Sequence, residues 1–195
     1  MTDQKAFLRG ICSNPADMAP RLVYSDWLEE RGETKQAEFI RRQIAGDTYV
    51  CLSGEDADKW FKPWWGTRPY RVMGHGKNIV LSYGTPAEPE REWISIKNGF
   101  PGTICRLTMG FMNQLSIFDR WPITDVYLRD CAPVETRTFH GSVEWLVPSI
   151  NLKRQGVDID ESWIFSTRNN AYARLSATLV NHGRALADLP LLQMK

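Results

Sequence analysis

Residues 19–44 read APRLVYSDWLEERGETKQAEFIRRQI, and this stretch constrains the fold more than any other part of the chain. Pro20 is tolerated in a first helical turn, where its missing N–H has no intrahelical partner to lose. Gly32 stands where a left-handed residue ends a helix, so a helix is expected over residues 20–31. Thr34 can cap a further helix, and two short helices separated by a tight turn are therefore predicted.

The apolar residues of these two helices recur at three-to-four spacing, which assigns their buried faces. In the helix over residues 20–31, the expected apolar stripe is Leu22, Val23, Trp27 and Leu28. Its expected solvent-facing residues are Arg21, Ser25, Glu29 and Glu30. In the next helix, which Gly46 ends, the apolar positions are Ala37, Phe39, Ile40 and Ile44. Acidic residues 26–33 and basic Arg41 and Arg42 can form exposed ion pairs, each contributing about 0–1 kcal/mol.

An earlier helix can begin at Thr2 or Asp3, and Asn14-Pro15 ends it. Three short helices are thus expected within residues 2–45. Each is too short to be stable alone in water, so they must pack on one another or on the chain that follows. We assign residues 1–48 to a helical module and residues 49–195 to a second domain.

The second domain combines strand signals with helix signals. Alternating, strand-like segments occur at residues 70–73, 78–83, 92–97, 102–108 and 123–130. Turns are expected at residues 75–77 and at Asn98-Gly99. A helix predicted over residues 113–121 lies between the last two strands, and that order permits a parallel crossover. It fits an α+β or an α/β second part, and we assign the chain to the α+β class, with a small mixed sheet and packed helices.

The C-terminal third is less regular until its end. Within residues 133–156 the best strand candidate is 143–147. The carboxylates of Asp158, Asp160 and Glu161 fit either an acidic loop or helix start, or a carboxylate site. A final helix is predicted over residues 167–189, and Gly183 inside it marks close packing or a break.

Charge and cysteine usage exclude several classes of protein. The formal net charge of +1 gives no global attraction to nucleic acid or to anionic membranes, and 43% hydrophobic residues can build a core. No apolar run approaches the ~20 residues of a membrane span, and no secretion signal is visible, so we expect a cytoplasmic protein without membrane contact. Four dispersed cysteines form no CxxC pair, and they are Cys12, Cys51, Cys105 and Cys131. We predict buried free thiols, no disulfide, no zinc and no cofactor.

Aromatic and basic residues concentrate in residues 59–77. The residues we select as candidates for partner binding are Trp60, Trp64, Trp65, Arg68, Tyr70 and Arg71. The tryptophans either pack the connection against the sheet or anchor a partner, because aromatic residues dominate interface energetics. Basic residues interleaved with aromatic ones also suit phosphate contact and base stacking, which makes nucleic acid an alternative partner. The expected helix over residues 20–31 is acidic, which argues against its insertion into a DNA groove.

Residues 6–44, AFLRGICSNPADMAPRLVYSDWLEERGETKQAEFIRRQI, resemble the bacterial repeat-companion domain, whose core reads LVYADWLEERG and is followed by an AEFIR-like helix. Later segments, NGFPGTICRLTMGFM, WPITDVYLRDCAP and LSATLVNHGRALADLPLL, are similar to those that follow this domain in some members. The family often accompanies leucine-rich-type repeats, whereas this chain contains one ITDVYLRD segment and no repeated unit. The resemblance implies a bacterial cytoplasmic accessory or interaction protein and carries over no catalytic residues.

Three hypotheses for the function follow. The first is a non-enzymatic protein–protein interaction module, acting as an accessory or regulatory subunit of a larger assembly. The second is nucleic-acid association through residues 59–77. The third is an enzyme with an unrecognised site, although no GxSxG, HExxH or glycine-rich phosphate loop is present and His75, His140 and His182 are isolated in sequence.

Overall fold

The computed structural model describes residues 3–61, 70–85, 88–106, 115–128 and 179–192. Several predicted features lie outside these residues and stay predictions. They are Trp64, Trp65, Arg68, His140, the strand at residues 143–147, the three carboxylates at residues 158, 160 and 161, and the first part of the C-terminal helix.

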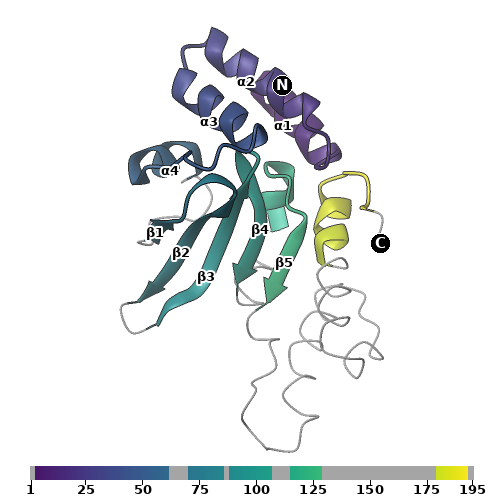
Figure 1. The fold of residues 1–195 in the computed structure, drawn as a ribbon. Coiled ribbons are helices and arrows are strands. Elements are labelled where there is room, and N and C mark those ends of the chain that lie inside the picture. The colour runs from purple at the N-terminus through teal and green to yellow at the C-terminus, as the bar shows by residue number, and fades with distance from the viewer. Residues whose placement is uncertain (1–2, 62–69, 86–87, 107–114, 129–178, 193–195) are drawn as a thin grey trace, which may run out of the picture.

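Four helices precede a five-stranded sheet in the described residues (Figure 1). The helices are α1 (Asp3–Ser13), α2 (Ala19–Glu30), α3 (Thr34–Ile44) and α4 (Gly54–Phe61). The strands are β1 (Tyr70–Met73), β2 (Ile79–Thr85), β3 (Glu88–Lys97), β4 (Phe100–Arg106) and β5 (Asp125–Leu128). Short 3-10 turns are η2 (Gly76–Asn78) and η3 (Leu115–Asp119), and a helical segment over residues 179–186 follows. The α+β class and the N-terminal three-helix run are confirmed.

The helix ends follow the local sequence signals in most places. Pro20 lies in the first turn of α2, and Gly32, which follows that helix, has φ +81°. The Ser53 hydroxyl accepts a hydrogen bond from the Asp56 N–H at 3.0 Å and so caps α4. Thr34 differs from the prediction, because it is the first residue of α3 and no side chain caps that helix. No described helix is long and apolar enough to cross a membrane.

The sheet has the strand order β1-β2-β3-β4-β5. The first four strands are antiparallel neighbours, whereas β5 runs parallel to β4, a pairing that the expected strand–helix–strand order permits. Asn98 (φ +51°) and Gly99 (φ +83°) form the predicted turn between β3 and β4. A Cβ on Gly99 would lie 2.5 Å from Cγ1 of Ile40, so glycine also lets this turn approach α3 closely.

The helix expected over residues 113–121 appears, in its described part, as the 3-10 turn η3. Its apolar residues Leu115, Phe118 and Trp121 recur every third residue. A spacing of three fits the three residues per turn of a 3-10 helix better than the 3.6 of an α-helix. The periodicity predicted the position of this helical segment correctly, but the predicted helix type was wrong.

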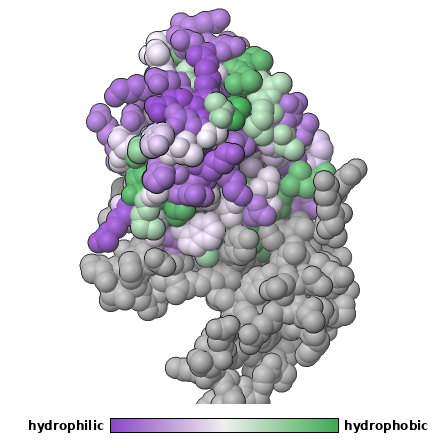
Figure 2. All heavy atoms as spheres, viewed as in Figure 1, coloured by the Kyte–Doolittle hydropathy of each residue, from purple (hydrophilic) through white to green (hydrophobic). Residues whose placement is uncertain are grey.

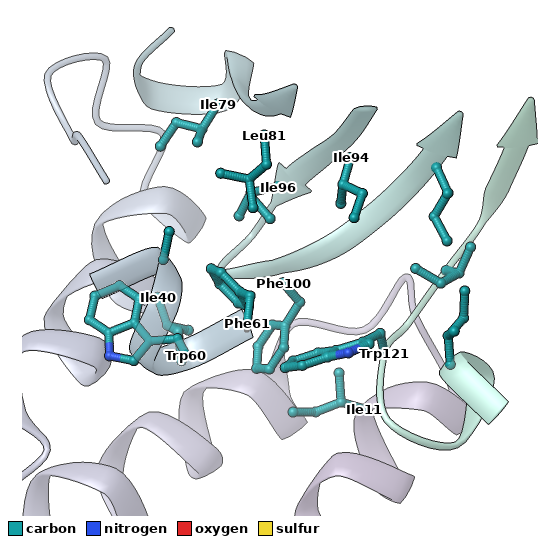
Figure 3. Close-up of a cluster of buried hydrophobic side chains, with 14 of the residues drawn as sticks. Ile11, Ile40, Trp60, Phe61, Ile79, Leu81, Ile94, Ile96, Phe100 and Trp121 are labelled. Atoms are coloured by element: carbon teal, nitrogen blue, oxygen red, sulfur yellow. The ribbon is translucent and has the colours of Figure 1, made fainter. Parts of the chain in front are cut away.

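One hydrophobic core joins the helices to the sheet (Figure 3). Leu81, Ile94, Ile104 and Val126 are aligned across β2 to β5, and all are buried. Three aromatic rings from α4, β4 and the segment after η3 meet below this row. The centroid of the Trp121 ring lies 5.6 Å from that of Phe61 and 6.2 Å from that of Phe100.

The C-terminal segment packs against η3 and α1. A Cβ on Gly183 would lie 2.1 Å from Cε2 of Phe118, so of the two roles predicted for this glycine it has that of close packing. The buried guanidinium of Arg184 donates hydrogen bonds to the carbonyl oxygens of Cys12 (2.8 Å), Ser13 (3.1 Å) and Pro190 (2.7 Å). Two of these carbonyls belong to the last turn of α1, where a cation is favoured. These hydrogen bonds hold the C-terminal segment against α1.

The described cysteines are free thiols in different surroundings. Cys12 and Cys105 are buried, which agrees with the prediction, and Cys51 is exposed, which does not. Cys51 lies in the connection between α3 and α4, where its neighbours Val50 and Leu52 are the buried residues. Burial raises the pKa of the Cys12 thiol to about 12, although nearby arginines act in the opposite direction.

Candidate functional site

Helix α2 faces the core with a different side from the predicted one. Its buried residues are Arg21, Tyr24, Ser25 and Leu28. Leu22 is 40% exposed and Val23 is 53% exposed, while Arg21 is 3% exposed and Ser25 is fully buried. The predicted orientation was therefore right for buried Leu28 and for exposed Glu29 and Glu30. It was wrong for these two apolar and two polar residues. Exposed aliphatic residues beside buried polar ones are the opposite of an ordinary amphipathic helix.

Local hydrogen bonds explain how α2 buries polar side chains. Arg21 donates a hydrogen bond from Nη1 to the Asp17 carbonyl oxygen at 2.8 Å, and its guanidinium lies 5.7 Å from the Phe100 ring centroid. The Ser25 hydroxyl donates to the Leu22 carbonyl oxygen at 2.7 Å. Because Nη1 of Arg21 and the Ser25 hydroxyl find partners on the helix and its N-terminal approach, these two groups enter the core at reduced cost.

Arg41 of α3 holds α2 on one side. Its Nη2 lies 2.6 Å from a carboxylate oxygen of Asp26 and 2.6 Å from one of Glu29. Its Nε donates to the Ser25 hydroxyl at 3.1 Å. These bonds to Glu29 and Asp26 raise the pKa of Arg41, so the guanidinium stays charged. The guanidinium of Arg41 thus fixes the rotation of α2 about its axis.

Aromatic contacts hold α2 on the side of α1. The Trp27 ring centroid lies 5.5 Å from that of Phe7 and 5.6 Å from that of Tyr24. The guanidinium of Arg31 lies 4.8 Å from the Trp27 ring centroid. Rotating α2 about its axis to bury Leu22 and Val23 would break its contacts with α1 and α3. The exposure of these two residues therefore follows from the packing of the three helices.

We define the α2 outer face as Leu22, Val23, Asp26, Glu29 and Glu30, all of which are exposed. The two apolar residues occupy the N-terminal half of the helix, and the acidic ones follow one and two turns later. Figure 2 shows apolar residues at the surface over α1 and α2, surrounded by hydrophilic ones. The α2 outer face therefore combines an aliphatic patch with an acidic one.

Every ionisable side chain that α2 exposes is acidic, because its one basic residue, Arg21, is buried. Arg41 neutralises part of the charge of Asp26 and Glu29. Glu30 forms no ion pair within the described part of the chain. It also lies in the last turn of the helix, where the macrodipole disfavours a negative charge. The position of this carboxylate thus does not stabilise its own helix.

The residues predicted to bind a partner do not form one surface in the described structure. Trp60 is only 9% exposed and packs against Phe39, with ring centroids 5.2 Å apart, so it is a core residue (Figure 3). The Tyr70 hydroxyl lies 2.8 Å from an Asp58 carboxylate oxygen and links β1 to α4. Arg71 is exposed and, as the next residue along β1, faces the opposite side of the sheet.

The same placement weakens the nucleic-acid hypothesis for the described residues. A buried Trp60 cannot stack on a base. The ammonium of Lys59 lies 2.5 Å from a carboxylate oxygen of Glu33, so this cation already has an anionic partner. Arg71 and Lys77 remain exposed cations of the segment.

No group of three or more histidine, cysteine or acidic residues gathers as a metal site in the described ranges. The Nδ1 atom of His75 lies 2.7 Å from the Thr48 carbonyl oxygen, which ties the β1–β2 connection to the chain after α3. This histidine therefore has a structural contact in the described part of the chain.

Comparison with protein families, with curated proteins and with solved structures finds no match to this chain. The candidate site therefore rests on the geometry of α2. Sequence reasoning missed the α2 outer face because the helix carries apolar residues on more than one side. That spread was itself a signal, since a helix with one apolar stripe has a single partner surface.

Proposed function

We propose that this chain is a non-enzymatic protein–protein interaction module that contacts its partner through the α2 outer face. In this proposal it acts as an accessory or regulatory subunit of a larger assembly in a bacterial cytoplasm. The observation that carries the proposal is the exposure of Leu22 and Val23 on a helix that buries Arg21 and Ser25. Aliphatic residues held outward at the expense of polar ones suit a surface that a partner covers.

The geometry suits binding in two ways. Covering Leu22 and Val23 would remove apolar surface from water, at roughly 25 cal/mol per Å². Arg41 and the aromatic contacts of Trp27 already fix the helix, so little conformational freedom remains to be lost on association. A preorganised helix face of this kind supports specific recognition.

The test is affinity purification of the tagged full-length protein from its native host, with nuclease treatment and a salt series. The Leu22→Gln/Val23→Gln variant is compared with wild type, and glutamine keeps good helix propensity at both positions. The matched control is Leu186→Gln, because Leu186 is another exposed leucine, at 63%. We expect a stoichiometric protein partner with wild type and with the control, and its loss with the α2 variant.

Two results would contradict the proposal. A partner retained equally by wild type and the α2 variant would place the contact elsewhere on the molecule. Recovery of nucleic acid alone, lost at moderate salt, would instead support the alternative of nucleic-acid association through Arg71, Lys77 and their neighbours.

A further inference from the structure

We infer that the partner segment covering the α2 outer face is an amphipathic helix whose aliphatic stripe is flanked by lysine or arginine. This inference rests on the proposed function and specifies the chemistry of its partner. It follows from the charge on the α2 outer face, from the spacing of its residues and from the surroundings of Glu30.

The net negative charge of the α2 outer face favours a basic partner. Three carboxylates are exposed there, and a single guanidinium, that of Arg41, bridges two of them. One bridging cation leaves that pair with a net negative charge, and Glu30 adds another. A neutral or acidic partner would desolvate these carboxylates without compensation, whereas lysine or arginine would pair with them.

The spacing on α2 suits a helical partner. Leu22 and Asp26 are one turn apart, and Val23 and Glu30 are two turns apart, so apolar and acidic positions follow the helix axis in sequence. A second helix lying along α2 presents its side chains with the same rise per turn. Its aliphatic residues would meet Leu22 and Val23, and its basic residues would meet the carboxylates in the next turns.

Glu30 supports the inference independently of the aliphatic pair. Its carboxylate is exposed, lies at the helix end that disfavours negative charge, and has no ion-pair partner in the described residues. Glu29, beside it, is already bound by Arg41. A cation supplied by the partner would give Glu30 the compensation that its own helix does not provide.

A second copy of this chain and a nucleic acid both fit the surface poorly. Two α2 helices packed in parallel would bring carboxylates against carboxylates. Packed antiparallel, they would cover the carboxylates with Leu22 and Val23 of the other copy and leave the charges unpaired. Phosphate groups would be repelled by the same carboxylates.

The experiment measures binding of two synthetic helical peptides to the full-length protein with labelled leucine and valine methyl groups. The peptides have equal length and identical leucine positions, and their flanking residues are lysine in one and glutamate in the other. We expect the lysine peptide to bind more tightly, and to shift the methyl signals of Leu22 and Val23. We expect Glu30→Lys to weaken the lysine peptide about two- to fivefold at low salt, the size of one exposed charge pair.

Glu30→Lys is a fair test because lysine suits the last turn of a helix, so the variant keeps a folded α2. The matched control is Glu38→Lys, which reverses an exposed acidic residue on α3 and is expected to leave the affinity unchanged. Weaker binding of the lysine peptide to Leu22→Gln/Val23→Gln, measured by titration calorimetry, would locate the bound peptide on α2, and the remaining leucine and valine methyl signals show that this variant is folded.

The outcomes distinguish a wrong partner chemistry from a wrong contact surface. Equal affinity for both peptides, or no effect of Glu30→Lys, would overturn the basic partner while leaving the α2 outer face as the contact. Absence of any methyl shift on α2 with either peptide would overturn both the basic partner and the proposed contact surface.

Discussion

Arg21 and Arg184 are both buried, yet their surroundings differ. Arg184 donates to three carbonyl oxygens, two of them at the end of α1. Arg21 donates to one carbonyl oxygen, and its Nε is buried without a hydrogen-bond acceptor among the described residues. Burial lowers the pKa of each guanidinium from its ordinary value. A buried cation stabilises a fold only where its donors are satisfied.

This difference predicts unequal effects of the same substitution. Arg184→Met leaves the carbonyls of Cys12 and Ser13 without their donor, and we expect it to lower the free energy of unfolding by about 2–4 kcal/mol. Arg21→Met keeps the length of the side chain and removes an incompletely bonded charge, so we expect a change within about 1 kcal/mol of wild type. Denaturant unfolding of both variants checks the comparison. A larger loss in Arg21→Met than in Arg184→Met would show that this view of the two arginines is wrong.

Among the helices, α2 shows what tertiary packing adds to local pattern. Its apolar residues allow more than one buried face, and the hydrophobic period alone did not select between them. The choice depends on Arg41 from α3, on Phe7 from α1 and on the Asp17 carbonyl, which are contacts formed only after folding. The sequence left the place of Trp60 open for a related reason, because an aromatic residue in a polar helix fits either a surface or a core.

Two glycines that lie in helices allow a test of helix packing. A Cβ on Gly183 would lie 2.1 Å from a buried ring carbon of Phe118, whereas one on Gly10 of α1 would have nothing within 4 Å. We expect Gly183→Ala to destabilise the protein by about 1–3 kcal/mol through overpacking. Gly10→Ala should stabilise it by about 0.5–1 kcal/mol through helix propensity. Thermal unfolding of the two variants measures both; a shift of the same sign in each would contradict the packing described around Gly183.

At the scale of the whole molecule, the helical module and the sheet share their core. The Gln43 side chain donates to the Gly76 carbonyl oxygen at 2.6 Å and accepts from the Gly99 N–H at 2.6 Å, so a buried residue of α3 joins two turns of the sheet. The predicted domain boundary at residue 48 stays a prediction. Residues from both sides of it belong to one hydrophobic cluster.

Much of the architecture could be predicted because it depends on local signals. The strand at residues 70–73 and the Asn98-Gly99 turn were confirmed, and the parallel last strand pair is one that the expected order permits. Turn residues and alternation act over a few positions and are visible in sequence. The candidate site depends instead on which side of α2 meets α1 and α3, and that choice is made by residues distant in the chain.

The central claim is that α2 holds Leu22 and Val23 outward, and the stability of the Leu22→Gln/Val23→Gln variant tests it most directly. The core control is Leu28→Gln in the same helix, since Leu28 is 3% exposed. Denaturant unfolding should show a loss below about 1 kcal/mol for the double variant, as for surface substitutions, and a loss of about 2–5 kcal/mol for Leu28→Gln. A double variant as unstable as Leu28→Gln would mean that Leu22 and Val23 belong to the core, and the α2 outer face would not exist as described.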